Sequence, residues 1–219
     1  MRVIAIDGPA GAGKSTVARA CAEALGLEVL NTGAMYRAVT YAAISAGADT
    51  SDNNACTKAA SSAKIELSDR VLLDGVDISQ EIRGALVTSE VSTVSAHPGV
   101  REVLVEKQRL WASQHGGAVV EGRDIGTVVF PDALVKVFLT ASDSERARRR
   151  VIDEQSAGRE ANFADVEADL ARRDATDSGR SISPLVAAKD ALILDSTTMA
   201  IDEVVETIVR EFLKREVLQ

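Results

Sequence analysis

The chain of 219 residues has few cysteines, namely Cys21 and Cys56. Two cysteines give neither a disulfide framework nor a pattern of metal ligands, which indicates a reduced, cytoplasmic setting. The sequence also lacks an apolar run that approaches the length of a membrane span. Its first apolar run ends within six residues, where the glycines begin, so we expect no signal peptide.

An excess of positive charge is missing as well. The formal net charge is −8, which argues against a nucleic-acid partner, because binding through counterion release needs a basic surface. The arginines nevertheless cluster, at 146–150 and at 172, 173 and 180. An acidic protein that gathers arginines in patches is expected to bind a small anion there.

No internal repeat, low-complexity tract or Pro/Gly/Ser-rich linker divides the chain. The composition, 46% hydrophobic and 26% charged, is typical of a globular protein. We therefore expect one domain over residues 1–219, with insertions, and a monomer.

Residues 8–15 read Gly-Pro-Ala-Gly-Ala-Gly-Lys-Ser and match the phosphate-binding loop pattern G-x-x-x-x-G-K-[ST]. A β-prone run, 2–7, precedes the loop, and a run of helix formers that ends at Gly26 follows it. Lys14 can reach the β- and γ-phosphates, and the Ser15 hydroxyl can bind Mg²⁺ that arrives with the ATP phosphates. The residues expected to bind ATP are Gly8, Pro9, Ala10, Gly11, Ala12, Gly13, Lys14, Ser15 and Thr16.

Short apolar runs alternate with helical patterns along most of the chain. The expected strands after the first are 27–30, 118–120, 134–139 and 191–194. Helical patterns run from 34 to about 45 and end near Glu154 and Val217. This alternation predicts an α/β fold, with a parallel sheet covered by helices on both faces and ligands at the carboxyl ends of the strands.

One region breaks the alternation. Residues 64–67 and 71–73 read as an antiparallel hairpin, with 76–78 as a possible third strand. We interpret residues 57–97 or so as a small inserted antiparallel β subdomain.

The sequence also lacks Asn-Lys-x-Asp, the guanine-reading motif that a GTP switch requires. Asp195 imitates the acid of a Walker B strand end, but 195–197 precedes a helical pattern and is interpreted as a helix N-cap. Glu121 is the better candidate for an acid that faces a metal through water, with a loop hydrogen-bond acceptor as the alternative.

Arginine is the expected residue where phosphate charges converge, because guanidinium stays charged and donates bidentately. In the run Arg146 to Arg150, three consecutive residues cannot all point the same way, so we expect about half of it to be a solvated face. Arg123 follows a buried strand, where a parallel sheet binds its ligand.

Four segments resemble bacterial cytidylate kinase. They are 4–16, 31–37, 121–132, and 173–180 followed by Ser-Pro-Leu at 183–185, and the resemblance runs from residue 3 to the last helix. It implies the nucleoside monophosphate kinase fold, with 57–97 as the acceptor-binding subdomain. The implied reaction is ATP + CMP or dCMP giving ADP + CDP or dCDP, with Mg²⁺. Ser15 stands where many relatives have Gly and restores the metal-binding hydroxyl, with Thr16 as an alternative.

The resemblance also implies roles for individual residues. The set expected to bind CMP is Thr32, Arg37, Ser92, Arg101, Arg123, Asp124, Arg173, Asp177 and Arg180. Within it, Ser92, Arg101 and Asp124 would read cytosine, and Arg123 would hold the acceptor phosphate. Residues 148–163 would form a short mobile lid over ATP.

The chemistry of the substrates supports these roles. Cytosine presents an N4 donor beside the N3 and O2 acceptors, so a carboxylate with Arg or Ser donors complements it. The acceptor phosphate oxygen is already ionised, so no general base is required. The groups expected to stabilise the transferred charge are Lys14, Arg123, Arg149 and Arg150, with Mg²⁺.

Two other interpretations remain open. One is another small-molecule kinase with the same core, such as a shikimate or coenzyme-precursor kinase, against which the insertion and Arg123-Asp124 argue. The other is a non-catalytic nucleotide sensor, which would bind both ligands without forming ADP.

Overall fold

The computed structural model describes residues 1–218, which form two compact units. The first unit comprises residues 1–29 and 115–218, and the second comprises residues 30–114. No described helix is long and apolar enough to cross a membrane.

The first unit is built on a five-stranded sheet in the order β2-β6-β1-β7-β8, of which β2 begins in the first unit and ends at the first residues of the second. The strands are β1 (Arg2–Asp7), β2 (Glu28–Asn31), β6 (Gly117–Gly122), β7 (Val135–Thr140) and β8 (Leu192–Asp195). Strand β1 pairs in parallel with β6 and with β7, and β7 pairs in parallel with β8. The predicted parallel α/β core is therefore confirmed.

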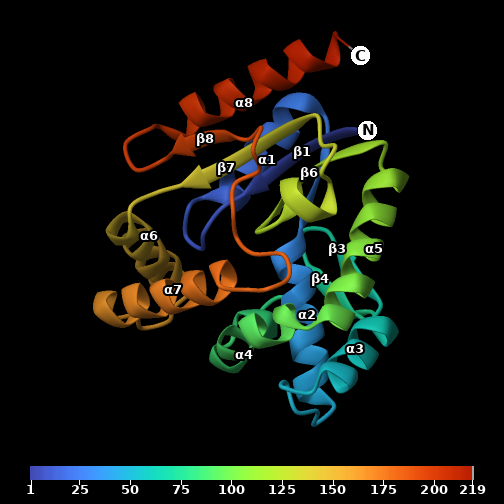
Figure 1. Cartoon of the computed structure of the whole chain (residues 1–219). Helices are drawn as coiled ribbons and strands as arrows, with labels where there is room; N and C mark the ends of the chain where they lie inside the picture. Colours follow the sequence, from blue (N-terminus) through green and yellow to red (C-terminus); the bar gives the residue numbers. More distant parts are fainter. Residues whose placement is uncertain (219) are drawn as a thin grey trace. The chain divides into compact units, whose positions relative to one another are not determined.

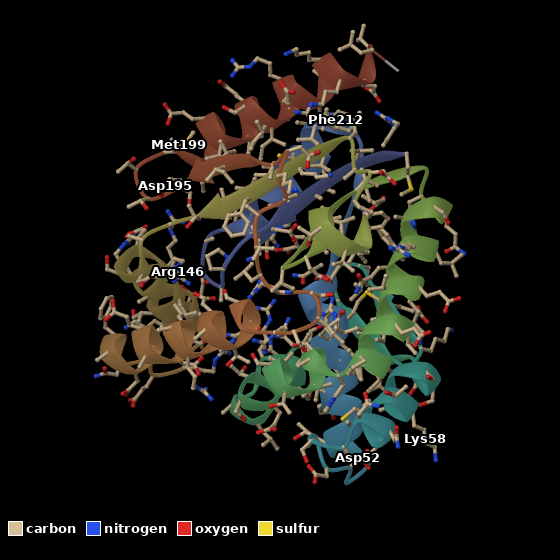
Figure 2. The ribbon with its side chains drawn as sticks, viewed as in Figure 1. Asp52, Lys58, Arg146, Asp195, Met199 and Phe212 are labelled. Atoms are coloured by element: carbon tan, nitrogen blue, oxygen red, sulfur yellow. The ribbon has the colours of Figure 1, made fainter. Side chains whose placement is uncertain are left out.

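Side-chain alternation along β1 decides what covers each face of the sheet. Ile4 and Ile6 point to a core formed with α1 (Lys14–Leu25) and α8 (Ile201–Glu216), and Phe212 on α8 is fully buried there (Figures 1 and 2). Asp7 points to the opposite face, where the π-helical turn η2 (Ile125–Val129) packs against β1 and β6. The polar end of β1 thus meets a backbone turn.

Two helices follow β7 and pack against each other, α6 (Asp143–Ser156) and α7 (Phe163–Ser178) (Figure 1). The residues expected to form a lid, 148–163, cover the second half of α6 and the connection to α7. The Ser142 side chain caps α6 by accepting from the Glu145 N–H, and the Asn162 side chain caps α7 in the same way.

The second unit contains α2 (Thr32–Ser45), α3 (Asn53–Ser62), η1 (Glu81–Arg83), α4 (Ala85–Ala96) and α5 (Pro98–Gln114). It also contains the antiparallel sheet of β3 (Ile65–Leu67), β4 (Val71–Leu73) and β5 (Val76–Asp77), which confirms the predicted hairpin and third strand. Ala38 on α2, with Ile78 and Ile82, forms the core on which this sheet packs.

One local prediction was wrong. Residues 195–197 are not a helix N-cap, because α8 begins at Ile201. The Asp195 carboxylate instead accepts from the Thr197 N–H at 2.9 Å and closes a turn after β8. The Glu203 carboxylate accepts from the Ala200 N–H at the start of α8.

Candidate functional site

The phosphate loop connects β1 to α1 and depends on glycine geometry. Gly8 has φ 147°, and a Cβ there would lie 2.0 Å from the Leu139 carbonyl oxygen, so only glycine fits. Gly13, at φ 90°, precedes α1 and provides no side-chain cap. The first N–H groups of α1 are therefore available to an anion, as at other phosphate-binding helix N-termini.

Lys14 lies inside this loop and is buried. Its ammonium Nζ donates to the Gly8 carbonyl at 2.8 Å and to the Pro9 carbonyl at 2.7 Å. Burial, followed by the charge of Arg123, lowers the pKa of Lys14 to about 7. Lys14 therefore releases its proton more easily than an exposed lysine does, and a bound anion would raise its pKa again.

Two arginines of α6 hold the phosphate loop from outside. Arg146 is buried and donates to the Ala10 carbonyl at 2.9 Å, and it also pairs with Asp174 on α7 (Figure 2). The Asp174 carboxylate accepts from the Ala10 N–H at 3.3 Å. Arg149 donates to the Ala12 carbonyl of the loop at 3.4 Å and to the Ser196 carbonyl at 2.6 Å. The arginine run of α6 is thus in part a support of the loop.

The other arginines of this run face elsewhere. Arg148 is exposed and donates to Glu145 at 2.7 Å, and Arg150 pairs with Glu154 at 2.5 Å. The run is thus only partly solvated, as expected, with Arg148 exposed and Arg146 buried. The spacing of three between Arg146 and Arg149 places both on one helix face, which is the sequence signal that indicates a shared role.

Asp177 on α7 gathers three of the residues expected to bind CMP. Its carboxylate accepts from Arg123 Nε at 2.9 Å and pairs with Arg180, and both Asp177 and Arg180 are nearly inaccessible to solvent. The pKa of the nearby Arg173 is lowered, by burial first and then by the charge of Arg123. We call Arg123, Arg173, Asp177 and Arg180 the Asp177 cluster.

The charges of the Asp177 cluster extend toward the phosphate loop. Arg123 acts on the pKa of Lys14 as well as on that of Arg173, and Arg150 also acts on Arg173. The charge of Glu121, which is buried on β6, partly offsets the lowering of the Lys14 pKa. The first unit therefore brings its predicted donor-side and acceptor-side cations into one electrostatic neighbourhood.

Asp124 directly precedes η2 and is buried. Its carbonyl accepts from the Val128 and Val129 N–H groups, which closes the π-helical turn. The Asp7 carboxylate accepts from the next two N–H groups, those of Ile125 and Gly126. Burial raises the pKa of Asp7 to about 6, and the charge of Asp124 contributes. Residue patterns alone gave no sign of this contact.

The remaining residues expected to bind CMP lie in the second unit. Arg101 is buried on α5, donates to the Ser95 carbonyl at 3.3 Å and lies over the ring of Tyr36, 5.6 Å from its centroid. Arg37 on α2 donates to the Ile82 carbonyl at 2.8 Å and to Thr88 Oγ1 at 2.9 Å.

Two further residues complete this second group. Thr32 is buried at the start of α2, and Ser92 is half-buried on α4. The set expected to bind CMP is thus divided, with Arg123, Asp124, Arg173, Asp177 and Arg180 in the first unit and Thr32, Arg37, Ser92 and Arg101 in the second.

Within residues 1–218, no group of three or more His, Cys, Asp or Glu side chains could hold a metal ion. Ser15, half-buried in the first turn of α1, is the nearest hydroxyl to the phosphate loop lysine in sequence. Mg²⁺ in kinases uses one or two protein ligands together with substrate phosphates and water. This donor set fits a metal that arrives with a nucleotide.

A family model described as cytidylate kinase matches residues 4–214. A cytidylate kinase of Desulfitobacterium hafniense (strain Y51) is 48% identical over 213 residues, which cover 95% of this chain and 91% of the relative. One of Mycolicibacterium paratuberculosis (strain ATCC BAA-968 / K-10) is 50% identical over 209 residues, with 93% and 92% covered.

A bifunctional pantoate ligase/cytidylate kinase of Trichormus variabilis (strain ATCC 29413 / PCC 7937) is 49% identical over 222 residues. The match covers 97% of this chain and 41% of that longer protein. Among solved structures, an uncharacterized protein from Eubacterium ventriosum ATCC 27560 has a TM-score of 0.57 at 11% identity, covering 97% of this chain and 98% of its own. That likeness concerns the fold alone. Because the family model and the closely similar relatives cover nearly the whole sequence, this chain belongs to the cytidylate kinase family.

Proposed function

We propose that the chain transfers the γ-phosphoryl group of ATP to CMP or dCMP and forms ADP with CDP or dCDP. The observation that carries the proposal is the register of β1 and β6, in which Asp7 pairs with Gly122, so that the phosphate loop and Arg123 follow neighbouring strand ends. The charge of Arg123 accordingly acts on the pKa of Lys14. One cation belongs to a phosphate loop and the other to the Asp177 cluster. Phosphoryl transfer needs both, since it brings two anionic groups together.

On the donor side, the phosphate loop and the N-terminus of α1 bind the phosphates of ATP. When ATP binds, Lys14 exchanges its two hydrogen bonds to the Gly8 and Pro9 carbonyls for bonds to phosphate oxygens. Because both carbonyls belong to the same loop, this exchange needs only a local movement of the side chain. Mg²⁺, when bound with ATP, neutralises charge on the phosphates, and the Ser15 hydroxyl would be its protein ligand.

On the acceptor side, Arg123 and Arg173 hold the phosphate of CMP. Asp177 keeps Arg123 in place and, with Arg173, faces the pentose. The resemblance to bacterial cytidylate kinase assigns Thr32 and Arg37, in the second unit, to the phosphate and sugar side of CMP. This assignment explains why cations accumulate around one buried carboxylate in a chain with net charge −8.

The base is read by Asp124, Ser92 and Arg101, with Arg180 close by. The Asp124 carboxylate would accept from cytosine N4, whereas uracil would turn its O4 acceptor toward it. Arg101 is already oriented by Tyr36 and Ser95, which reduces the rotamer freedom that binding must remove.

Transfer itself requires no general base, because the attacking phosphate oxygen is ionised near neutral pH. The protein contributes orientation and charge: Lys14 and Arg123 act on the transferred group, and Arg149 and Arg150 join them when the lid 148–163 closes. Closure excludes water that would otherwise hydrolyse ATP. Hydrogen exchange in 148–163 is expected to slow when CMP and a non-hydrolysable ATP analogue are added together, and unchanged exchange would contradict the lid assignment.

An acceptor screen tests the proposed function. Initial rates of ADP formation are measured with CMP, dCMP, UMP, AMP, GMP and shikimate at saturating MgATP. We expect CMP and dCMP to give the highest kcat/KM. ADP formation with shikimate alone would support the other small-molecule kinase. Binding of ATP and CMP without any ADP would support the sensor.

We also propose that the enzyme works as a monomer in the cytoplasm, where ATP and CMP are available. The acidic sequence favours no nucleic-acid partner. Light scattering coupled to size exclusion tests the oligomeric state, and cell fractionation tests the location.

A further inference from the structure

Asp7 occupies an unusual position in the first unit. It is the last residue of β1 and directly precedes Gly8, the first glycine of the phosphate loop. It is 3% exposed and points to the face of the sheet that carries η2. Burying a carboxylate is costly unless its oxygens are satisfied, so its contacts define its role.

Both oxygens of Asp7 are used by one short stretch of backbone. Oδ1 accepts from the Ile125 N–H and Oδ2 from the Gly126 N–H, each at 2.7 Å. These two residues follow Arg123 and Asp124 without a break. A carboxylate is the side chain that offers two equivalent acceptors at this spacing, whereas an amide would turn a donor toward one of the N–H groups.

The packing around this contact leaves little room for adjustment. A Cβ on Gly126 would lie 3.2 Å from the Lys136 side chain and 3.4 Å from Asp7 Oδ2. On the other side of the loop, Arg123 is tied to Asp177. The segment 122–126 is therefore held at both ends, by Asp7 and by the Asp177 cluster.

We propose that Asp7 is a positioning residue for phosphoryl transfer, which fixes the Arg123-Asp124 segment relative to the phosphate loop through its two backbone hydrogen bonds. The inference rests on the proposed function. The donor phosphates bind the loop that begins next to Asp7, and the acceptor is held by the segment that Asp7 anchors. Small errors in the distance between reacting groups cost large factors in rate, so this single side chain controls the geometry of the transfer.

The first test compares Asp7→Asn with the wild type in kcat, in KM for CMP and in the ATP dissociation constant measured by calorimetry. We expect kcat to fall about 10- to 100-fold and KM for CMP to rise, while ATP binding changes less than about threefold. Phe212→Leu is the control for lost stability, since Phe212 lies in the α1–α8 core on the other face of the sheet. It should lower Tm and leave kcat unchanged.

The groups that act on Asp7 allow a second readout. They are Asp124, whose charge raises the pKa of Asp7, and Lys14, whose charge lowers it, with the Lys136 stem packed beside the same contact. Protonation of Asp7 removes an acceptor, so wild-type kcat at saturating substrates should fall as the pH drops through about 6. The Asp7→Asn profile should lack this component, a difference that lost stability alone does not produce.

The outcomes separate the two proposals. A wild type that makes no CDP from CMP overturns the proposed function and this inference with it. A wild type that makes CDP, together with a folded Asp7→Asn of unchanged kcat and pH profile, overturns the inference alone. If Asp7→Asn does not fold, Asp7→Glu keeps the charge and moves both acceptors by one methylene. A reduced kcat with intact ATP binding then supports the inference, and wild-type kcat overturns it.

Discussion

The phosphate loop and the Asp177 cluster both concentrate positive charge, and they accommodate it in different ways. Lys14 is held by the carbonyls of Gly8 and Pro9, and its pKa falls to about 7. Arg123 and Arg180 share the buried carboxylate of Asp177. An amine can release a proton when it is buried, whereas guanidinium cannot and requires a counter-ion.

This difference teaches how each region is prepared for its anion. Burial in the loop lowers the pKa of Lys14, and the phosphates of ATP would raise that pKa again. The Asp177 cluster keeps its arginines charged and oriented at all times. The carboxylate of Asp177, however, competes with the phosphate of CMP for the same guanidinium groups. The donor region is thus tuned by protonation, and the acceptor region by pairing.

The largest effect is expected for Lys14→Ala, which removes the cation of the donor region. Turnover should fall by about three orders of magnitude, in the range seen for loss of one preorganised charge donor. The fold should persist, because Lys14 faces the loop and not the α1–α8 core. Lys64→Ala, on the exposed hairpin, is the matched control. Normal turnover in a folded Lys14→Ala protein would contradict the assigned role.

Lys14→Ala also tests whether the pKa of Lys14 is lowered in the folded protein. Because the folded pKa of Lys14 is lowered to about 7, the folded state binds fewer protons than the unfolded chain between about pH 7 and 10. The free energy of unfolding of the wild type should therefore rise with pH in this window relative to Lys14→Ala. Denaturant titrations at pH 6 and pH 9 measure it, and a constant difference would argue against the lowered pKa.

Asp177→Asn tests the ion pairing of the acceptor region by removing its shared carboxylate. Arg123 and Arg180 would lose their shared counter-ion, so kcat/KM for CMP should fall about 100-fold, corresponding to roughly 3 kcal/mol. ATP affinity should stay within about threefold, because the carboxylate bonds to Arg123 and Arg180 and not to the phosphate loop itself. Asp165→Asn, at an exposed position on the same helix α7, should behave like the wild type. An equal loss of ATP affinity would show that the two regions are not separable.

Asp124→Asn tests recognition of the base in the acceptor region. It changes the side chain proposed to contact cytosine without removing an arginine. The amide can donate to uracil O4, so activity on UMP should suffer less than activity on CMP. A buried polar mismatch costs about 1–3 kcal/mol, so the preference for CMP should fall by one to two orders of magnitude. Measuring kcat/KM with both substrates checks this. An equal drop for both would mean that Asp124 only holds the loop.

The smallest effect is a proton count. Because the pKa of Lys14 is lowered to about 7, we expect part of the ligand-free protein to carry a neutral Lys14 at pH 8. Binding of ATP, which is fully ionised at this pH, should raise that pKa and take up protons. Calorimetry in buffers of different ionisation enthalpy measures the uptake, with Lys14→Ala as the control. CMP binding to the arginines should take up none, and equal uptake by both nucleotides would remove the distinction between the regions.

Local signals in the sequence were sufficient for much of the fold. The alternation of apolar strands and helices predicted the parallel core, and Ser68-Asp69-Arg70 between two β-prone runs predicted the β3–β4 hairpin. Both depend on neighbouring residues, so they can be read without knowledge of distant contacts. The boundary at Asp195 was misread because a side chain that closes a turn and one that caps a helix have the same sequence appearance.

In the candidate site, too, some features follow from neighbouring residues and others from distant contacts. The phosphate loop follows from the sequence alone, because glycine conformations, a lysine and a helix N-terminus are all local. The resemblance of the sequence to bacterial cytidylate kinase also indicated the arginines and Asp177 as site residues. Only the tertiary structure decided that Arg146 and Asp174 hold Ala10, and that Asp7 accepts from Ile125 and Gly126, 118 and 119 positions away. These contacts join side chains to backbone N–H and carbonyl groups, which every residue carries, so no pattern of residue types can mark them in advance.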